Sequence, residues 1–372
     1  MNLELNEDQQ LIDHALERYL KSAGDYAARR ALAQTAPGYA QEDWQFFADI
    51  GLLAMSFPEQ FGGQDAGFGD TALVMERFGK ELLTVPYLAG VVLAGGVLRR
   101  VAASPLRAEC LDALGQGRML LAAGIDPDTT NLRAQACEGG YRIDGGAQLV
   151  MHGPAAQRYI VTAELNGAPA LLLVDAGPAG PVVEPYRLID GSPACDLAFD
   201  EVVVARERLL AHGESAASIV QDVLAEARAA LCAEAAGCMQ ALFGMTLDYV
   251  RQRKQFGRAI GSFQVIQHRL ADGYTALEQV KSMALLAARS VGSGAASRHR
   301  DVAAAKAFIG EAGIRMGHDA IQLHGAMGMT EELAVGGYHK RLLVIDALLG
   351  DACVQVGRFI AMEPECAGAA LA

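Results

Sequence analysis

The feature that most limits how this chain can fold is the spacing of its apolar residues, which changes twice along the sequence. Up to about residue 116 the apolar residues recur at helical spacing, from about 117 to 212 they alternate as in strands, and from about 214 helical spacing returns. We therefore predict an α+β fold with three domains. These are an N-terminal helical domain (1–116), a middle β-barrel-like domain (117–213) and a C-terminal four-helix bundle (214–372).

The first segment carries local signals for helix starts and turns. Asn6 and Gln9 have the spacing of a capping box, in which each side chain bonds the other residue's backbone N–H. Further helices are predicted over 43–53 and 70–83, on either side of a turn-rich loop at 58–63.

The middle segment contains a strong hairpin signal. The dipeptide Asn166-Gly167 lies between two strand-like runs, 159–162 and 170–174, and such a pair favours a two-residue turn. Additional strands are predicted at 141–144, 197–199 and 202–204.

Three long helices are predicted in the last segment, over about 216–251, 262–292 and 301–324. The first is rich in alanine and glycine, which allows another helix to approach closely. Ser262 is the predicted N-cap of the second helix, and Gly325 is predicted to end the third.

Composition excludes several classes of function. The net charge is −13, from 31 basic and 44 acidic residues, so nucleic acid is excluded as a partner, although local basic clusters could still bind a phosphorylated ligand.

No apolar run is long enough for a membrane span, and the N-terminus does not have the pattern of a secretory signal. Seven dispersed cysteines, Cys366 among them, predict reduced thiols and a cytoplasmic location. The histidines have no metal-ligand spacing, so no metal site is expected.

Two motifs give the chain a specific resemblance. The run Arg253-Lys254-Gln255-Phe256-Gly257 resembles the R-x-x-F-G segment of the acyl-CoA dehydrogenase family. The run from Gln322 to Glu332 is similar to that family's Q-x-x-G-G-x-G-x-T-x-E pattern, with Ala326 where glycine is usual. The resemblance covers nearly the whole chain and implies a flavoprotein that oxidises an acyl-CoA across its α and β carbons.

In the family, the two motifs hold the adenosine-diphosphate half of an FAD that is bound mainly to a neighbouring subunit. The resemblance assigns that role here to Arg253, Phe256, Gln264, Gln322, Gly325 and Gly328. A guanidinium suits a pyrophosphate because it donates two parallel hydrogen bonds, and glycines let a backbone approach a ligand closely. The alternatives are that Arg253 is a solvated cation at a helix end and that Phe256 fills a core.

The chain departs from the family at the catalytic base. Family members place a glutamate at one of two positions, and these fall on Leu349 and Ala227 here. Neither side chain can accept a proton, so no catalytic residue is assigned. Glu226 is predicted to face elsewhere on its helix as a solvated carboxylate, while Arg228 matches a family arginine near the substrate cavity.

Two other carboxylates lie near the C-terminal base position, and either could be a displaced base. These are Asp346 and Asp351. Asp351 follows Gly350 where a helix is expected to begin, so it could instead serve the helix dipole.

The elements that cradle the flavin ring in the family are also changed. The loop T-E-P-x-x-G-S-D corresponds to residues 124–131, where Thr129 or Thr130 is only a weak substitute for the family's hydroxyl. The aromatic-x-hydroxyl element corresponds to Leu149-Val150-Met151. These losses lie on a different domain from the missing base.

The combination resembles the small, β-type subunit of heteromeric family members, such as those acting on pimeloyl-CoA-type diacids or steroid side chains. The run from Tyr338 to Leu343 resembles that group as well. The resemblance implies a homologous partner subunit in a heterotetramer, an acyl-CoA substrate and electron-transfer flavoprotein as acceptor. The alternatives are a self-sufficient homotetramer with a displaced base, a non-catalytic structural paralogue, and a relative with other flavin chemistry.

Overall fold

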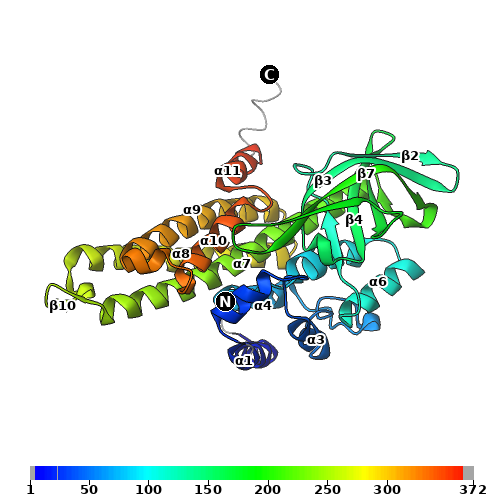
Figure 1. Cartoon of the computed structure of the whole chain (residues 1–372). Coiled ribbons are helices and arrows are strands. Elements are labelled where there is room, and N and C mark those ends of the chain that lie inside the picture. The colour runs from blue at the N-terminus through cyan, green and yellow to red at the C-terminus, as the bar shows by residue number, and fades with distance from the viewer. Residues whose placement is uncertain (1–4, 23, 363–372) are drawn as a thin grey trace, which may run out of the picture. The chain divides into compact units, whose positions relative to one another are not determined.

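The computed structural model describes residues 5–22 and 24–362, so Cys366 lies outside the described part (Figure 1). The described chain divides into two compact units. The bundle unit contains the described residues of 1–28, 68–83 and 228–372, and the sheet unit contains 29–67 and 84–227. The division into domains at 116/117 and 213/214 remains a proposal.

The helices are α1 (Glu7–Ser22), α2 (Tyr26–Ala33), α3 (Gln41–Asp49), α4 (Phe68–Lys80), α5 (Gly95–Arg100), α6 (Pro105–Gly115), α7 (Glu214–Gln252), α8 (Gln264–Gly292), α9 (Arg298–His324), α10 (Ala334–Ala347) and α11 (Ala352–Ala361). A π-helix, η2 (Tyr87–Ala94), leads into α5. Short 3₁₀ turns are η1 (Glu59–Phe61), η3 (Gly153–Ala155), η4 (Arg206–Arg208), η5 (Ile260–Ser262) and η6 (Gly325–Met329).

The strands are β1 (Leu121–Gly124), β2 (Leu132–Cys137), β3 (Gly140–Met151), β4 (Arg158–Leu165), β5 (Ala168–Asp175), β6 (Val182–Arg187), β7 (Pro193–Ala205) and β8 (Leu209–His212), with β9 (Lys254–Gln255) and β10 (Arg258–Ala259) in a separate ribbon. The large sheet has the order β6-β7-β3-β2-β4-β5-β8, and β1 pairs with β4. The helix–sheet–helix order confirms the predicted fold class.

Local signals in the sequence are confirmed at several points. Asn6 and Gln9 form the reciprocal capping box, with N···O distances of 3.1 and 2.8 Å. The β4–β5 hairpin turns at Asn166 and Gly167, both with positive φ (53° and 77°), as a two-residue turn requires. Helix α9 ends at His324, directly before Gly325.

The predicted N-cap of the second long helix is wrong. Helix α8 begins at Gln264 with Phe263 as its N-cap, so the helix starts two residues later than predicted. Ser262 instead ends the 3₁₀ turn η5, and its hydroxyl donates to the carbonyl of Ala259 at 2.7 Å. The hydroxyl therefore acts as a donor within the turn and does not accept from the helix N-terminus.

Close helix packing in the bundle unit depends on two glycines. A Cβ on Gly79 of α4 would lie 2.0 Å from the carbonyl oxygen of Glu234, and one on Gly237 of α7 would lie 2.0 Å from that of Glu76. The backbones of α4 and α7 therefore touch at this crossing. Helix α9 packs against α8, α10 and α11, as Figure 1 shows.

Helix α7 is long and apolar enough by composition to cross a membrane, but 67% of its apolar window is buried inside the protein. Its apolar surface therefore belongs to the protein core.

Candidate functional site

The first predicted cofactor motif follows the C-terminal end of α7 and forms the exposed β9–β10 ribbon. Phe256 lies at the turn of this ribbon with φ +52°, and 91% of its surface is exposed. The alternative that Phe256 fills a core is therefore wrong. The exposed ring stands edge-on to Phe263, with ring centroids 6.1 Å apart, and is accessible to a ligand or a partner.

The polar residues of the motifs are equally accessible. Arg253, Gln264 and Gln322 are all exposed, and their side chains form no hydrogen bond or ion pair within the described residues. Arg253 directly follows the last residue of α7, so its charge also complements the helix dipole there. Its assignment to the cofactor stays a prediction.

The second motif forms η6 after α9. Gly325 has φ +61° and ψ −139°, a conformation that side chains rarely permit, and a Cβ there would meet nothing within 4 Å. Gly328 is buried, and a Cβ there would lie 2.9 Å from the carbonyl oxygen of Ile321. Gly325 thus leaves open space for a ligand, whereas Gly328 has a packing reason to be glycine.

The structure brings the two motifs to the same end of the bundle unit. Tyr249, four residues before Arg253, stacks on His324 with ring centroids 4.3 Å apart and donates to the His324 carbonyl at 3.3 Å. These motifs fit the tail of FAD: they present an exposed ring, an open glycine, and one guanidinium and two amides that have no partner in the described part of the chain. When bound, FAD would supply the hydride acceptor that the chain's own side chains cannot provide.

The backbone at the predicted base position is held from several sides. Leu349 lies between α10 and α11 with φ +59°, a left-handed conformation that is rare for leucine. Its carbonyl oxygen accepts from Arg228 (3.0 Å), Gln355 (2.8 Å) and Arg358 (2.9 Å). Arg228 thus has a structural partner, and its predicted contact with substrate stays a prediction.

A buried lysine supports the same turn. Lys306 of α9 has 0% exposure and donates to the carbonyls of Asp346 (2.8 Å) and Gly350 (3.2 Å). Burial lowers the pKa of Lys306, and the nearby Cys232 and Asp346 partly offset this. Burial raises the pKa of Asp346, while its carboxylate accepts from the backbone N–H of Ala352 at 3.1 Å.

The other candidate carboxylates have structural partners as well. Asp351 is the N-cap of α11 and accepts from Val354 N at 2.8 Å, which confirms the helix-end role considered for it. Glu226 is not a solvated carboxylate as predicted: it is 6% exposed and ion-paired to Arg99 (2.9 Å) and Arg100 (2.6 Å) in the sheet unit. Two guanidiniums from α5 occupy both of its oxygens.

The two segments predicted to correspond to the family's flavin-ring elements lie next to each other in the sheet unit. Gln148 N donates to the Thr129 carbonyl at 2.8 Å, so the 124–131 loop borders the 149–151 element. Leu149 has φ +56°, and its N–H donates to Asp196 at 3.0 Å. The hydroxyl of Thr130 is buried and has no partner within the described residues.

Sequence reasoning missed the residues that hold the turn at 349–350. Lys306, Gln355 and Arg358 come from α9 and α11, and only contacts between distant helices reveal their shared target. One signal was available in the sequence: Gln355 is the polar residue of the otherwise apolar run 352–356, and the structure buries it fully. Tyr249, one turn before Arg253, was missed for the same reason.

Comparisons with known proteins identify the same family that the two motifs resemble. Residues 6–118 match the family described as acyl-CoA dehydrogenase, N-terminal domain, and 217–361 match acyl-CoA dehydrogenase, C-terminal domain. The chain is 30% identical over 348 residues to acyl-CoA dehydrogenase FadE27 of Mycobacterium tuberculosis, covering 90% of this chain and 92% of the relative.

Solved structures match over nearly the full length. A chain of the ChsE4-ChsE5 complex from Mycobacterium tuberculosis has a TM-score of 0.89 at 28% identity, covering 98% of this chain and 100% of that one. The FAD complex of PigA also has a TM-score of 0.89, at 26% identity, covering 99% and 100% of the two chains.

Proposed function

Because the chain belongs to the acyl-CoA dehydrogenase family, we propose that it is the subunit of a hetero-oligomeric, FAD-dependent acyl-CoA dehydrogenase that lacks the catalytic base and completes its partner's FAD site. The observation that carries this proposal is the turn at Leu349. The backbone is held by Arg228, Gln355 and Arg358, yet the side chain at this position cannot accept a proton.

The engaged carboxylates support the same proposal. Glu226, Asp346 and Asp351 would each have to give up structural bonds before acting as a general base. A base must reach the proton that it abstracts, and these groups are already committed to arginines or to backbone N–H groups. The proton at the α carbon of the acyl thioester would therefore be taken by a carboxylate of the partner subunit.

The roles of this chain's own residues follow from exposure. Arg253 would donate paired hydrogen bonds to the pyrophosphate of FAD, and Phe256 would cover the tail from the β9–β10 turn. Gln264, Gln322 and Gly325 would complete the contact and so help to hold the group that supplies the hydride acceptor. The similarity to a chain of the ChsE4-ChsE5 complex supports an unlike, homologous partner.

The test is a flavin count. The chain expressed alone is expected to hold well under one FAD per polypeptide, because the ring elements at 124–131 and 149–151 depart from the family pattern. Co-expression with a homologous acyl-CoA dehydrogenase subunit should yield a complex with bound FAD and turnover. Absorbance at the flavin maximum, divided by polypeptide concentration, gives the measurement. One tightly bound FAD per lone chain, together with turnover, would refute the proposal.

A second prediction concerns the carboxylates. Changing Glu226, Asp346 or Asp351 to alanine, one at a time, should leave kcat of the folded, FAD-loaded complex within about tenfold, whereas a true base contributes about 10²- to 10⁴-fold. Loss of a cap or ion pair should appear in the melting temperature instead. A hundredfold fall in kcat for one variant, with flavin and assembly intact, would show that this chain carries its own base.

One observation favours the second candidate, a self-sufficient homo-oligomeric dehydrogenase. The buried, unpartnered hydroxyl of Thr130, within the described residues, could serve the flavin ring in place of the family's usual hydroxyl. The flavin count on the lone chain separates the two candidates.

A further inference from the structure

Tyr249, near the end of α7, is joined to both of the predicted cofactor-tail motifs. Its carbonyl oxygen accepts from the backbone N–H of Arg253 at 2.8 Å. The Arg253 carbonyl in turn accepts from the N–H of Ile260 at 2.8 Å, which closes the base of the β9–β10 ribbon. The Tyr249 ring stacks on His324, the last residue of α9, with ring centroids 4.3 Å apart and planes at 26°. One residue therefore contacts the chain segment that leads into each motif.

His324 is held on several sides, directly before the open turn at Gly325. It is 5% exposed, and its Nδ1 lies 2.8 Å from the Ala320 carbonyl oxygen, which can only accept, so Nδ1 carries a proton. The His324 carbonyl, which belongs to the peptide plane before Gly325, accepts from the Tyr249 hydroxyl at 3.3 Å. This distance is long for an O–H···O bond, so the stacked rings contribute more to the contact than the hydroxyl does.

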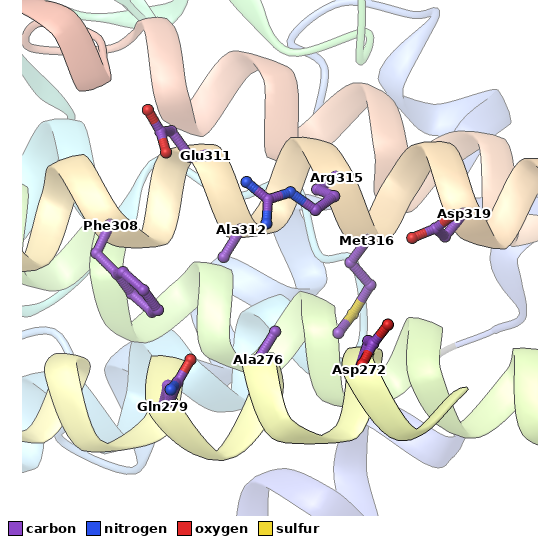
Figure 2. Close-up of a pocket in the computed structure, with 10 residues that line it drawn as sticks. Asp272, Ala276, Gln279, Phe308, Glu311, Ala312, Arg315, Met316 and Asp319 are labelled. Atoms are coloured by element: carbon purple, nitrogen blue, oxygen red, sulfur yellow. The ribbon is translucent and has the colours of Figure 1, made fainter. Parts of the chain in front are cut away.

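The contact between α9 and α8 does little to fix this end of α9. A groove of about 140 Å³ lies between the two helices, and its lining on α9 extends to Asp319, little more than one turn before His324. Figure 2 shows Met316 extending from α9 toward α8 in this groove. Asp319 pairs with Arg269 at 2.8 Å, but the two side chains are 41% and 44% exposed, and exposed pairs contribute little. His324 therefore depends on α7, through Tyr249, for its position beside the ribbon.

We propose that Tyr249 and His324 are positioning residues for the FAD tail, because their stack fixes the Arg253 ribbon and the open backbone at Gly325 relative to each other. Neither side chain has to touch FAD in this role. A ligand that contacts two motifs binds less tightly when their separation varies, because that freedom is lost on binding. The inference rests on the proposed function, since it requires that the two motifs hold one cofactor.

The test measures FAD release from the complex with the homologous subunit used for the flavin count, by dilution and flavin fluorescence. Tyr249→Leu and His324→Leu each remove the stack, and each is expected to weaken FAD retention about tenfold, as for residues coupled within one network. Tyr249→Phe keeps the stacked ring and should stay within about threefold of the wild type, because it loses only the long hydroxyl bond. His324→Leu carries the test if Tyr249→Leu fails to fold.

Leu242→Ala is the control for a general loss of stability. Leu242 lies two turns before Tyr249 on α7, is 0% exposed and belongs to neither motif. Its truncation should lower the melting temperature yet leave FAD retention within about twofold, because it does not touch the stack. Amide hydrogen exchange on the lone chain gives a measurement without FAD: residues 254–259 and 325–329 should exchange faster in Tyr249→Leu than in Leu242→Ala.

The outcomes separate the inference from the proposed function. Weaker retention in both leucine variants, with recovery in Tyr249→Phe and no loss in Leu242→Ala, supports the inference. Wild-type retention in both leucine variants overturns it, and the proposed function stands if Arg253→Ala still releases FAD. If Arg253→Ala has no effect either, the proposed tail site is wrong as well. An equal loss in Leu242→Ala, or no recovery in Tyr249→Phe, would overturn the role of the stack.

Discussion

Replacing Arg253 by alanine is expected to weaken FAD retention by the assembled complex roughly ten- to a hundredfold while leaving this chain folded. The loss of a charge-assisted bidentate contact costs about 1.5–3 kcal/mol, and each 1.4 kcal/mol is tenfold in affinity. The chain itself should tolerate the change because the Arg253 side chain is exposed and forms no bond within the described residues. Flavin release during stepwise dilution, followed by fluorescence, measures the effect.

Arg251 provides a matched control for this variant. It lies two residues earlier, is similarly exposed, and among the described residues its side chain forms one ion pair, with Asp248 at 4.0 Å. Arg251→Ala removes the same charge from the same helix end, so it tests the alternative that Arg253 is a solvated helix-end cation. Equal FAD affinity for both variants and the wild type would return Arg253 to that alternative.

Replacing Gly237 by alanine is expected to cause the largest loss of stability, roughly 3 kcal/mol in the free energy of unfolding. The new Cβ would lie 2.0 Å from the carbonyl oxygen of Glu76 and 2.9 Å from the backbone N of Lys80. Both neighbours are backbone atoms, so no side chain can move aside and α4 must shift away from α7. A thermal melt followed by circular dichroism measures the change.

Gly244 on the same helix serves as the control. A Cβ there would meet nothing within 4 Å, and alanine is preferred over glycine in helices by up to about 1 kcal/mol. Gly244→Ala should therefore melt at or above the wild-type temperature. If both variants melted together, the close crossing of α4 and α7 would not contribute to stability as argued.

The local parts of the fold were predictable because short-range chemistry decides them. The capping box at Asn6 and Gln9 and the turn at Asn166-Gly167 need only neighbouring residues. Alanine and glycine in the first long helix indicated close packing, and Gly237 at the α4 crossing bears this out. The prediction that Ser262 caps the second long helix was wrong, because its hydroxyl donates within the 3₁₀ turn that precedes this helix.

The site was less predictable, because its partners come from distant segments. The sequence of its own helix predicted a solvated Glu226. Its partners Arg99 and Arg100 come from α5, which follows the π-helix η2 far away in the sequence. Lys306 could not be linked to Gly350 by spacing, since 44 residues separate them. Helical period predicts the face of a side chain, but the neighbouring helix decides what that face meets.

The turn at Leu349 also bears on how a subunit without a base, as proposed above, could arise. The side chains that hold the turn all donate to main-chain carbonyls, of Asp346, Leu349 or Gly350, so the shape of the turn does not depend on the leucine side chain. The main-chain conformation of the turn can therefore be kept while the residue at position 349 is replaced. Duplicated genes could then separate their duties through single substitutions at such a position, with no new fold to be evolved for either product.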